Sequence, residues 1–128
     1  MALVIIGTGL AGYNLAREWR KLNPTSDLVI LTRDDGRNYS KPMLSTGYTK
    51  GKTADQLAMQ TAEQMAEQLK ADIRTFASVS AIDAVAKTVT VNGDVLAYDK
   101  LVLALGADPF QPPLAGDGLE RVYTVNDL

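Results

Sequence analysis

The chain has 128 residues, 46% of them hydrophobic and 22% charged, and a formal net charge of −2. These values are typical of a single globular domain and give no electrostatic reason to expect nucleic acid or an anionic membrane as a partner. The chain contains no cysteine and no histidine, which excludes disulfides, thiolate chemistry and histidine acid–base catalysis, and we expect no metal site.

The N-terminal residues predict a βαβ unit. Leu3–Ile6 is a short apolar run typical of a buried strand, and Leu28–Leu31 is a second one. Such a crossover builds a parallel sheet, so the predicted fold class is α/β. Between the strands, a helix that ends at Asn23 and Pro24 is indicated by apolar residues at helical spacing: Leu15, Ala16, Trp19 and Leu22.

The middle of the chain predicts a long loop followed by two helices. Residues 33–52 are polar and rich in turn-forming residues, and a loop of this length favours a functional role. Thr53 and Thr61 each begin a Thr-x-x-Gln capping box, which predicts a helix start. The second helix is expected to bury an apolar face made of Ala58, Ala62, Met65, Ala66 and Leu69.

The remaining residues predict short strands. Residues 72–76 are a strand candidate, and residues 79–98 predict three antiparallel strands with Asn92 and Gly93 as a type I′ hairpin turn. Residues 101–105 are apolar throughout and predict another buried strand. The tail from Ala107 is rich in proline and glycine and predicts a loop, within which residues 121–125 (RVYTV) are a candidate for a short strand.

Three glycines follow the first strand in the pattern G-x-G-x-x-G. Gly7 would permit the tight turn, Gly9 would let a phosphate approach the backbone, and Gly12 would let the helix pack on the strand. The helix start would then offer free N–H groups to a pyrophosphate, including those of Leu10 and Ala11. A merely tight turn is the alternative, but the surrounding βαβ unit favours a dinucleotide-binding site.

Two acidic residues, Asp34 and Asp35, follow the second strand. A carboxylate at this distance from the glycines accepts hydrogen bonds from the ribose hydroxyls of a dinucleotide. Between the two we favour Asp35. The neighbouring Arg33 offers an alternative, in which it binds a 2′-phosphate, but the two acids beside it make this the weaker interpretation.

Two further stretches, NYSKPMLS (residues 38–45) and LVLALGADP (residues 101–109), carry a family resemblance. With the antiparallel insertion before the last parallel strand, they resemble the FAD domain of the pyridine nucleotide-disulfide oxidoreductase class. Within the class the chain is most similar to the rubredoxin–NAD(P)+ reductase branch, with flavorubredoxin reductases a close second. The resemblance covers nearly the whole chain and implies a partial Rossmann-like FAD-binding domain, a parallel sheet with a βαβ start and an antiparallel β-meander insertion.

The resemblance also carries site roles onto matching positions. It implies that Lys41 and Pro42 lie beside the flavin and the pyrophosphate, and that Val79 offers backbone hydrogen bonds to the adenine. It implies no catalytic acid or base, because the flavin carries the chemistry. The segment whose backbone passes the cofactor would contain Ala104, Gly106 and also Leu105, which stands where the family usually has threonine.

The function implied is an FAD-dependent reductase that passes electrons from NAD(P)H to a small iron protein such as rubredoxin, expected in the cytoplasm. The absence of cysteine argues against the dithiol members of the class. Two alternatives stay open: a stand-alone dinucleotide-binding or sensing module without catalysis, and an interaction protein built on a Rossmann-like half without a ligand.

Only one G-x-G-x-x-G is present, and no second FAD half follows the last parallel strand. We therefore interpret residues 1–128 as a single N-terminal part of an FAD/NAD(P)-binding domain, with the NAD domain, the second FAD half and the C-terminal domain absent. Such a part would leave apolar surface uncovered. We expect it to be inactive alone, to bind FAD weakly and to form a homodimer.

Overall fold

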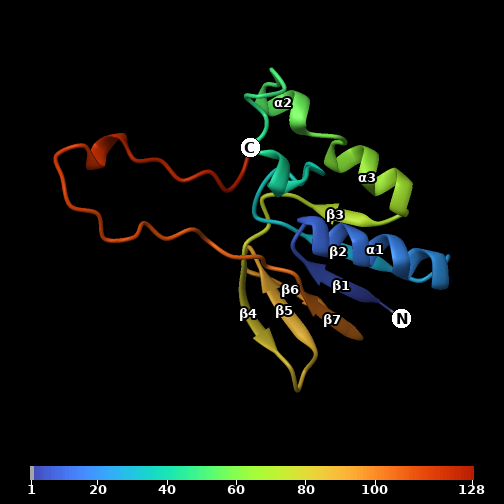
Figure 1. Ribbon diagram of the computed structural model, residues 1–128. Coiled ribbons are helices and arrows are strands. Elements are labelled where there is room, and N and C mark those ends of the chain that lie inside the picture. Colours follow the sequence, from blue (N-terminus) through green and yellow to red (C-terminus); the bar gives the residue numbers. More distant parts are fainter. Residues whose placement is uncertain (1) are drawn as a thin grey trace.

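A four-stranded parallel sheet forms the centre of the computed structural model, which describes residues 2–128 (Figure 1). Its strands lie in the order β3-β2-β1-β7, with bounds β1 Leu3–Ile6, β2 Leu28–Leu31, β3 Asp72–Arg74 and β7 Lys100–Leu103. In register, Ile6 at the end of β1 lies opposite Leu31 of β2 and Leu103 of β7. The carboxyl ends of neighbouring strands therefore meet at one edge of the sheet.

Two helices cover one face of this sheet, α1 (Leu10–Leu22) and α3 (Ala62–Leu69). The short helix α2 (Ala54–Leu57) precedes α3. Both predicted capping boxes are confirmed, because Thr53 and Thr61 each accept from the backbone of the glutamine three residues later, whose side chain accepts from the threonine N–H. On α3 the predicted apolar face is buried at Ala62, Met65 and Leu69. Ala58, predicted to belong to this face, lies before the helix, at the C-cap of α2.

The other face is covered by a three-stranded antiparallel sheet of β4 (Val79–Asp83), β5 (Thr88–Val91) and β6 (Asp94–Ala97). Asn92 and Gly93 have φ of 50° and 88°, as a type I′ hairpin turn requires. The predicted meander and its turn are confirmed. The molecule is thus layered as helices, parallel sheet and antiparallel sheet, a mixed α/β fold (Figure 1).

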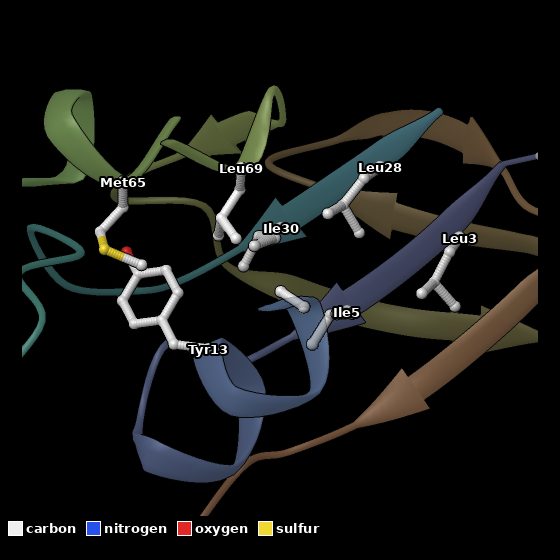
Figure 2. Packing of buried hydrophobic residues seen from close by; sticks show 8 residues of the cluster. Leu3, Ile5, Tyr13, Leu28, Ile30, Met65 and Leu69 are labelled. Carbon is white, nitrogen blue, oxygen red and sulfur yellow. The ribbon is translucent and has the colours of Figure 1, made fainter. Parts of the chain in front are cut away.

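Alternate residues of the central strands belong to two separate hydrophobic cores, since successive side chains of a strand point to opposite faces of the sheet. Leu3 and Ile5 pack with Tyr13 of α1 on the helical side (Figure 2). Val4 and Ile6 pack on the other side, against the antiparallel sheet. Burying one such side chain fully contributes about 2 kcal/mol, so both covering layers stabilise the short strand β1.

Two sequence expectations, on the burial of Leu22 and on a strand at residues 121–125, need correction. Leu22 is 80% exposed although its spacing predicted the buried face of α1, whose buried positions are Gly12, Tyr13 and Ala16. Residues 121–125 form no strand: a 3₁₀ turn, η2 (Leu119–Arg121), is followed by extended chain with Val125 71% exposed. No sheet edge of the described residues pairs with this segment, and an unpaired strand is not stable.

The last parallel strand is shorter and less buried than predicted. It ends at Leu103, which is 56% exposed, because β7 is an edge strand of the sheet within residues 2–128. The strand predicted over residues 72–76 likewise ends early, at Arg74, where a turn begins. Among the described residues, no helix has the length and apolar character needed to cross a membrane.

Candidate functional site

The loops that leave the carboxyl ends of the parallel strands gather at one edge of the sheet. The glycine loop follows β1, residues 32–36 follow β2, and residues 104–106 follow β7. Gly7 N–H donates to Leu31 O at 2.8 Å and Ala104 N–H donates to Ile6 O at 2.8 Å, so the three loops start side by side. Parallel α/β sheets bind their ligands at this edge.

Two of the three motif glycines are required by close packing. Gly7 has φ of +116°, and a Cβ there would lie 2.0 Å from Ala104 O. A Cβ on Gly12 would lie 2.0 Å from Gly7 O. No side chain fits at either position, because these distances are far shorter than any van der Waals contact allows. Ala104 thereby packs directly against the glycine loop.

Gly9 differs from the other two glycines. A Cβ on Gly9 would meet no atom within 4 Å, and its φ of −67° and ψ of −174° are open to any residue. The protein's own packing therefore gives no reason for glycine at this position. The space above it is open where the backbone of a G-x-G-x-x-G loop approaches a pyrophosphate.

Helix α1 begins at this same open surface. Gly9 is its N-cap, no side chain caps it, and its first turn contains no acidic residue. Leu10 and Ala11 are exposed. The N–H groups of the first turn have no partner within a helix, and the helix dipole makes this end positive. The start of α1 can therefore accept an anion.

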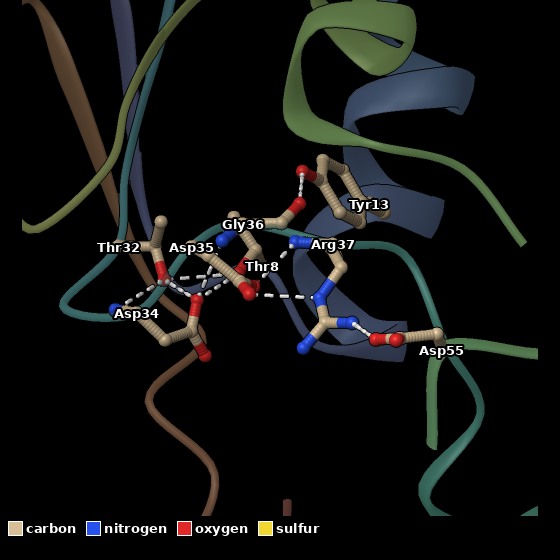
Figure 3. Close-up of polar contacts among 8 residues, drawn as sticks. All are labelled: Thr8, Tyr13, Thr32, Asp34, Asp35, Gly36, Arg37 and Asp55. Atoms are coloured by element: carbon tan, nitrogen blue, oxygen red, sulfur yellow. Dashed lines mark hydrogen bonds and ion pairs between the residues drawn. The ribbon is translucent and has the colours of Figure 1, made fainter. Parts of the chain in front are cut away.

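A chain of hydroxyl and carboxylate groups connects the glycine loop to the end of β2 (Figure 3). Thr8 Oγ1 donates to Thr32 Oγ1 at 3.0 Å, and Thr32 Oγ1 donates to Asp34 Oδ1 at 2.7 Å. Gly36 N–H also donates to Asp34 Oδ1, at 2.8 Å. Sequence reasoning missed both threonines, although their positions inside the glycine motif and directly after a strand are a usable signal.

The carboxylates of Asp34 and Asp35 differ in their hydrogen-bond partners. Both carboxylate oxygens of Asp35 are engaged by Arg37, through Nε at 2.7 Å and the backbone N–H at 3.2 Å. Arg37 also donates to Asp55 at 3.0 Å. Asp34 is held through Oδ1, while its Oδ2 accepts from no other described residue. The geometry therefore favours Asp34 over Asp35 for binding ribose, the reverse of the preference drawn from sequence.

Tyr13 fixes the loop that carries these acids. Its buried hydroxyl donates to Gly36 O (Figure 3). Burial first, and then the negative charge of Asp34, raise the pKa of Tyr13 well above its usual value. The hydroxyl therefore stays protonated and acts as a structural donor from α1 to the loop.

A pocket of about 230 Å³ opens beside the acids. It is lined by both acids and by Tyr39 and Phe76, and residues 127 and 128 also reach it. Burial, followed by the charge of Asp34, raises the pKa of Tyr39. Tyr48, in the same loop as Tyr39, is 98% exposed.

Lys41 lies in the loop after β2, at the start of the 3₁₀ turn η1 (Lys41–Met43), in which Pro42 follows it. Its Nζ donates to Asn126 Oδ1 at 3.2 Å, and Asn126 Nδ2 donates to Ala107 O at 3.3 Å. Lys41 is thus held beside the segment that follows β7. Asn126 is a further residue that sequence reasoning missed.

The remaining predicted site residues occupy separate places. Val79 begins β4 and is half-buried in the core between the two sheets. Leu105 is 66% exposed, and Gly106 has φ of +68°. Arg33, the candidate for a 2′-phosphate, pairs with Asp108 at 2.6 Å, and this hydrogen bond raises the pKa of its guanidinium.

Comparison with known proteins identifies close relatives. The chain is 59% identical over 126 residues to rubredoxin-NAD(+) reductase of Alcanivorax borkumensis, covering 98% of this chain and 33% of that protein. It is 44% identical to rubredoxin-NAD(+) reductase of Acinetobacter baylyi and 38% identical to nitric oxide reductase FlRd-NAD(+) reductase of Vibrio vulnificus, with the same coverage. The chain spans about a third of the length of the curated relatives it matches.

Solved structures share the fold. Putidaredoxin reductase, in its covalent complex with putidaredoxin, matches with a TM-score of 0.77 and 30% identity over 94% of this chain and 29% of that chain. An engineered water-forming NADPH oxidase bound to NADPH matches with a TM-score of 0.80 and 27% identity, over 99% of this chain and 30% of that chain.

The family model described as pyridine nucleotide-disulphide oxidoreductase matches residues 1–128. The resemblance read from the glycine motif, the NYSKPMLS stretch and the LVLALGADP stretch is thereby confirmed. The chain belongs to the pyridine nucleotide-disulphide oxidoreductase family.

Proposed function

We propose that residues 1–128 form the N-terminal, FAD-binding part of an NAD(P)H-dependent reductase that passes electrons to a small iron protein such as rubredoxin. The single observation that carries the proposal is Gly9. The space over it is open, while Gly7 and Gly12 are closed by packing. Packing within the protein therefore does not explain why residue 9 is glycine. A diphosphate lying against the backbone at this position would explain it.

The residues fit the two polar parts of such a cofactor. The first turn of α1, with Gly9, Leu10 and Ala11, would hold the diphosphate through backbone N–H groups. The free oxygen of Asp34 would accept a hydrogen bond from the ribose, and Thr8 and Thr32 keep the carboxylate next to the glycine loop.

The remaining contacts follow the family resemblance. Lys41 and Pro42 would lie by the flavin, Val79 would offer its backbone to the adenine, and residues 104–106 would pass along the cofactor. Bound FAD would supply the redox chemistry by accepting electrons in pairs from NAD(P)H and releasing them singly. The chain's own residues then need only bind, orient and exclude water, which agrees with the absence of histidine and cysteine.

The nature of the acceptor is proposed from relatives of two kinds. Proteins 59% and 44% identical to this chain are named rubredoxin-NAD(+) reductases. A structural relative, putidaredoxin reductase, was captured in a covalent complex with putidaredoxin. An iron-protein acceptor is therefore the best-supported proposal for the complete protein.

The test uses the complete protein that carries residues 1–128. We expect it to purify with the yellow absorbance of flavin, to release FAD on denaturation, and to reduce rubredoxin with NADH or NADPH. Lys41→Ala should slow this reduction, while Lys50→Ala, a matched change of an exposed lysine in the same loop, should not. Release of a nicotinamide dinucleotide instead of FAD, or nucleotide binding without electron transfer, would contradict the proposal and favour a sensing module.

A further inference from the structure

Phe76 adopts a backbone conformation that aromatic residues avoid. It lies in the turn between β3 and β4 with φ of +50°, in the left-handed region. The other non-glycine residues with positive φ among the described residues are polar. Two of them lie where a helix end or a tight turn requires this conformation: Lys70 at the end of α3 and Asn92 in the hairpin turn. A bulky residue with positive φ is a genuine outlier, and such strain persists only where the surroundings impose it.

Hydrogen bonds from both sides impose this conformation. Phe76 N–H donates to Asp34 O at 3.0 Å, and Phe76 O accepts from Asn92 Nδ2 at 3.2 Å. The next residue, Ala77, donates to Thr32 O at 2.7 Å. The turn is therefore fixed to the end of β2 on one side and to the hairpin on the other.

Phe76 belongs to neither hydrophobic core of the protein. The residue is 68% exposed although the turn around it is fixed. Glycine would meet the backbone demand without strain, and a polar side chain would meet the exposure. Folding therefore explains neither the aromatic ring nor its exposure.

The position of the ring supplies an explanation. Phe76 lines the same pocket as Asp34, Asp35 and Tyr39, and its own N–H is bonded to the Asp34 backbone. A carboxylate beside a flat apolar ring offers one acceptor for sugar hydroxyls and one surface for a base. These are the two recognition elements of a nucleoside.

We propose that the Phe76 ring packs against the adenine of the bound dinucleotide, next to the ribose held by Asp34. This rests on the proposed function, since it names the residue that contacts the base within the same site. Aromatic stacking tolerates any base, so Phe76 would contribute affinity for the nucleoside end, and the acids would contribute its orientation.

The test compares Phe76→Gly with Phe76→Tyr in this chain, using calorimetric titration with ADP and the melting temperature without ligand. Phe76→Gly should melt at the same temperature or higher, because glycine accepts the backbone conformation, and should bind ADP about tenfold more weakly. Phe76→Tyr keeps the ring and should bind ADP within about twofold of the unaltered chain. Phe110→Gly, which removes an aromatic ring that is 81% exposed, is the matched control and should leave ADP binding unchanged.

Equal ADP affinity of Phe76→Gly and the unaltered chain would overturn this inference and leave the proposed function standing. A large fall in melting temperature in Phe76→Gly would also overturn it, because the ring would then be a packing residue. If the unaltered chain bound neither ADP nor FAD, the proposed function would fail and this inference with it.

Discussion

Asp34 and Asp35 are adjacent in sequence, yet their side chains have different partners. Asp35 is bound at both oxygens by Arg37, whereas Asp34 keeps one oxygen free. We expect Asp34→Asn to weaken ADP binding about tenfold, the effect of losing one hydrogen bond to a charged acceptor. Asp35→Asn should change ADP binding less than threefold. Calorimetric titration of both variants measures this, and a larger loss in Asp35→Asn would restore the preference drawn from sequence.

Tyr13 makes stability depend on pH at the alkaline end. Burial raises its folded-state pKa above the value of about 10 in the unfolded chain. Above that pH the unfolded chain loses this proton first, so the stabilisation is complete below about pH 10 and is lost as pH rises further. Relative to Tyr13→Phe, the unaltered chain should lose about 1 kcal/mol of unfolding free energy between about pH 10 and pH 11.

Urea denaturation at a series of pH values, followed by the fluorescence of the single tryptophan, Trp19, measures this loss. Tyr48→Phe is the matched control, since Tyr48 is 98% exposed, and should keep the pH dependence of the unaltered chain. Parallel curves for Tyr13→Phe and the unaltered chain would show that the Tyr13 hydroxyl is not buried as described.

Sequence alone could identify the glycines and the acid pair, because both belong to a local pattern with a fixed spacing. It could not show which of Asp34 and Asp35 is free to bind ribose, since this depends on which carboxylate the Arg37 guanidinium contacts in the folded chain. The Thr8–Thr32 contact joins residues 24 positions apart, so the position of each threonine could mark it as a site candidate but could not show that the two side chains meet.

At the scale of elements, Arg20 joins the ends of two helices. Its guanidinium donates to Asn23 O, Ser26 O, Leu69 O and Lys70 O, at 2.7 to 3.0 Å. These carbonyls lie at or beyond the C-termini of α1 and α3, where a carbonyl oxygen has no N–H donor within its own helix. We expect Arg20→Ala to lower the free energy of unfolding by about 3 kcal/mol.

Lys21→Ala is the matched control, because the ion pair of Lys21 with Glu18 is exposed on both sides and should contribute less than about 1 kcal/mol. Urea denaturation followed by tryptophan fluorescence compares the two variants. Equal unfolding free energies would mean that the Arg20 contacts do not hold α1 against α3.

The elements that sequence predicted well are those with local signals. Capping boxes at Thr53 and Thr61 and the turn at Asn92 depend on residues within four positions, and all three are confirmed. The exposure of Leu22 and the extended chain at residues 122–125 depend on which neighbours lie nearby. A periodic pattern of apolar residues shows that a helix face or strand could be buried. Whether it is buried depends on which other elements the fold places against it.

At the scale of the whole molecule, apolar surface gathers at one border of the sheet. Within residues 2–128, β7 is an outermost strand, and Leu103 and Leu105 are 56% and 66% exposed there. Exposed apolar strand edges favour pairing with a second copy. We expect this chain to self-associate in sedimentation velocity runs, and Leu103→Lys to shift it toward the monomer. Leu22→Lys, at a more exposed leucine on α1, should not, and a monomer at every concentration would contradict this prediction.

The central claim is that a diphosphate lies against the backbone at Gly9, and titration of FAD into the unaltered chain and Gly9→Ala tests it most directly. Because a Cβ at Gly9 meets no atom of the protein, we expect Gly9→Ala to melt at the unaltered temperature yet to bind FAD at least about tenfold more weakly. Gly12→Ala, whose Cβ would lie 2.0 Å from Gly7 O, should instead unfold at a much lower temperature. Unaltered FAD affinity in a stably folded Gly9→Ala would contradict the claim.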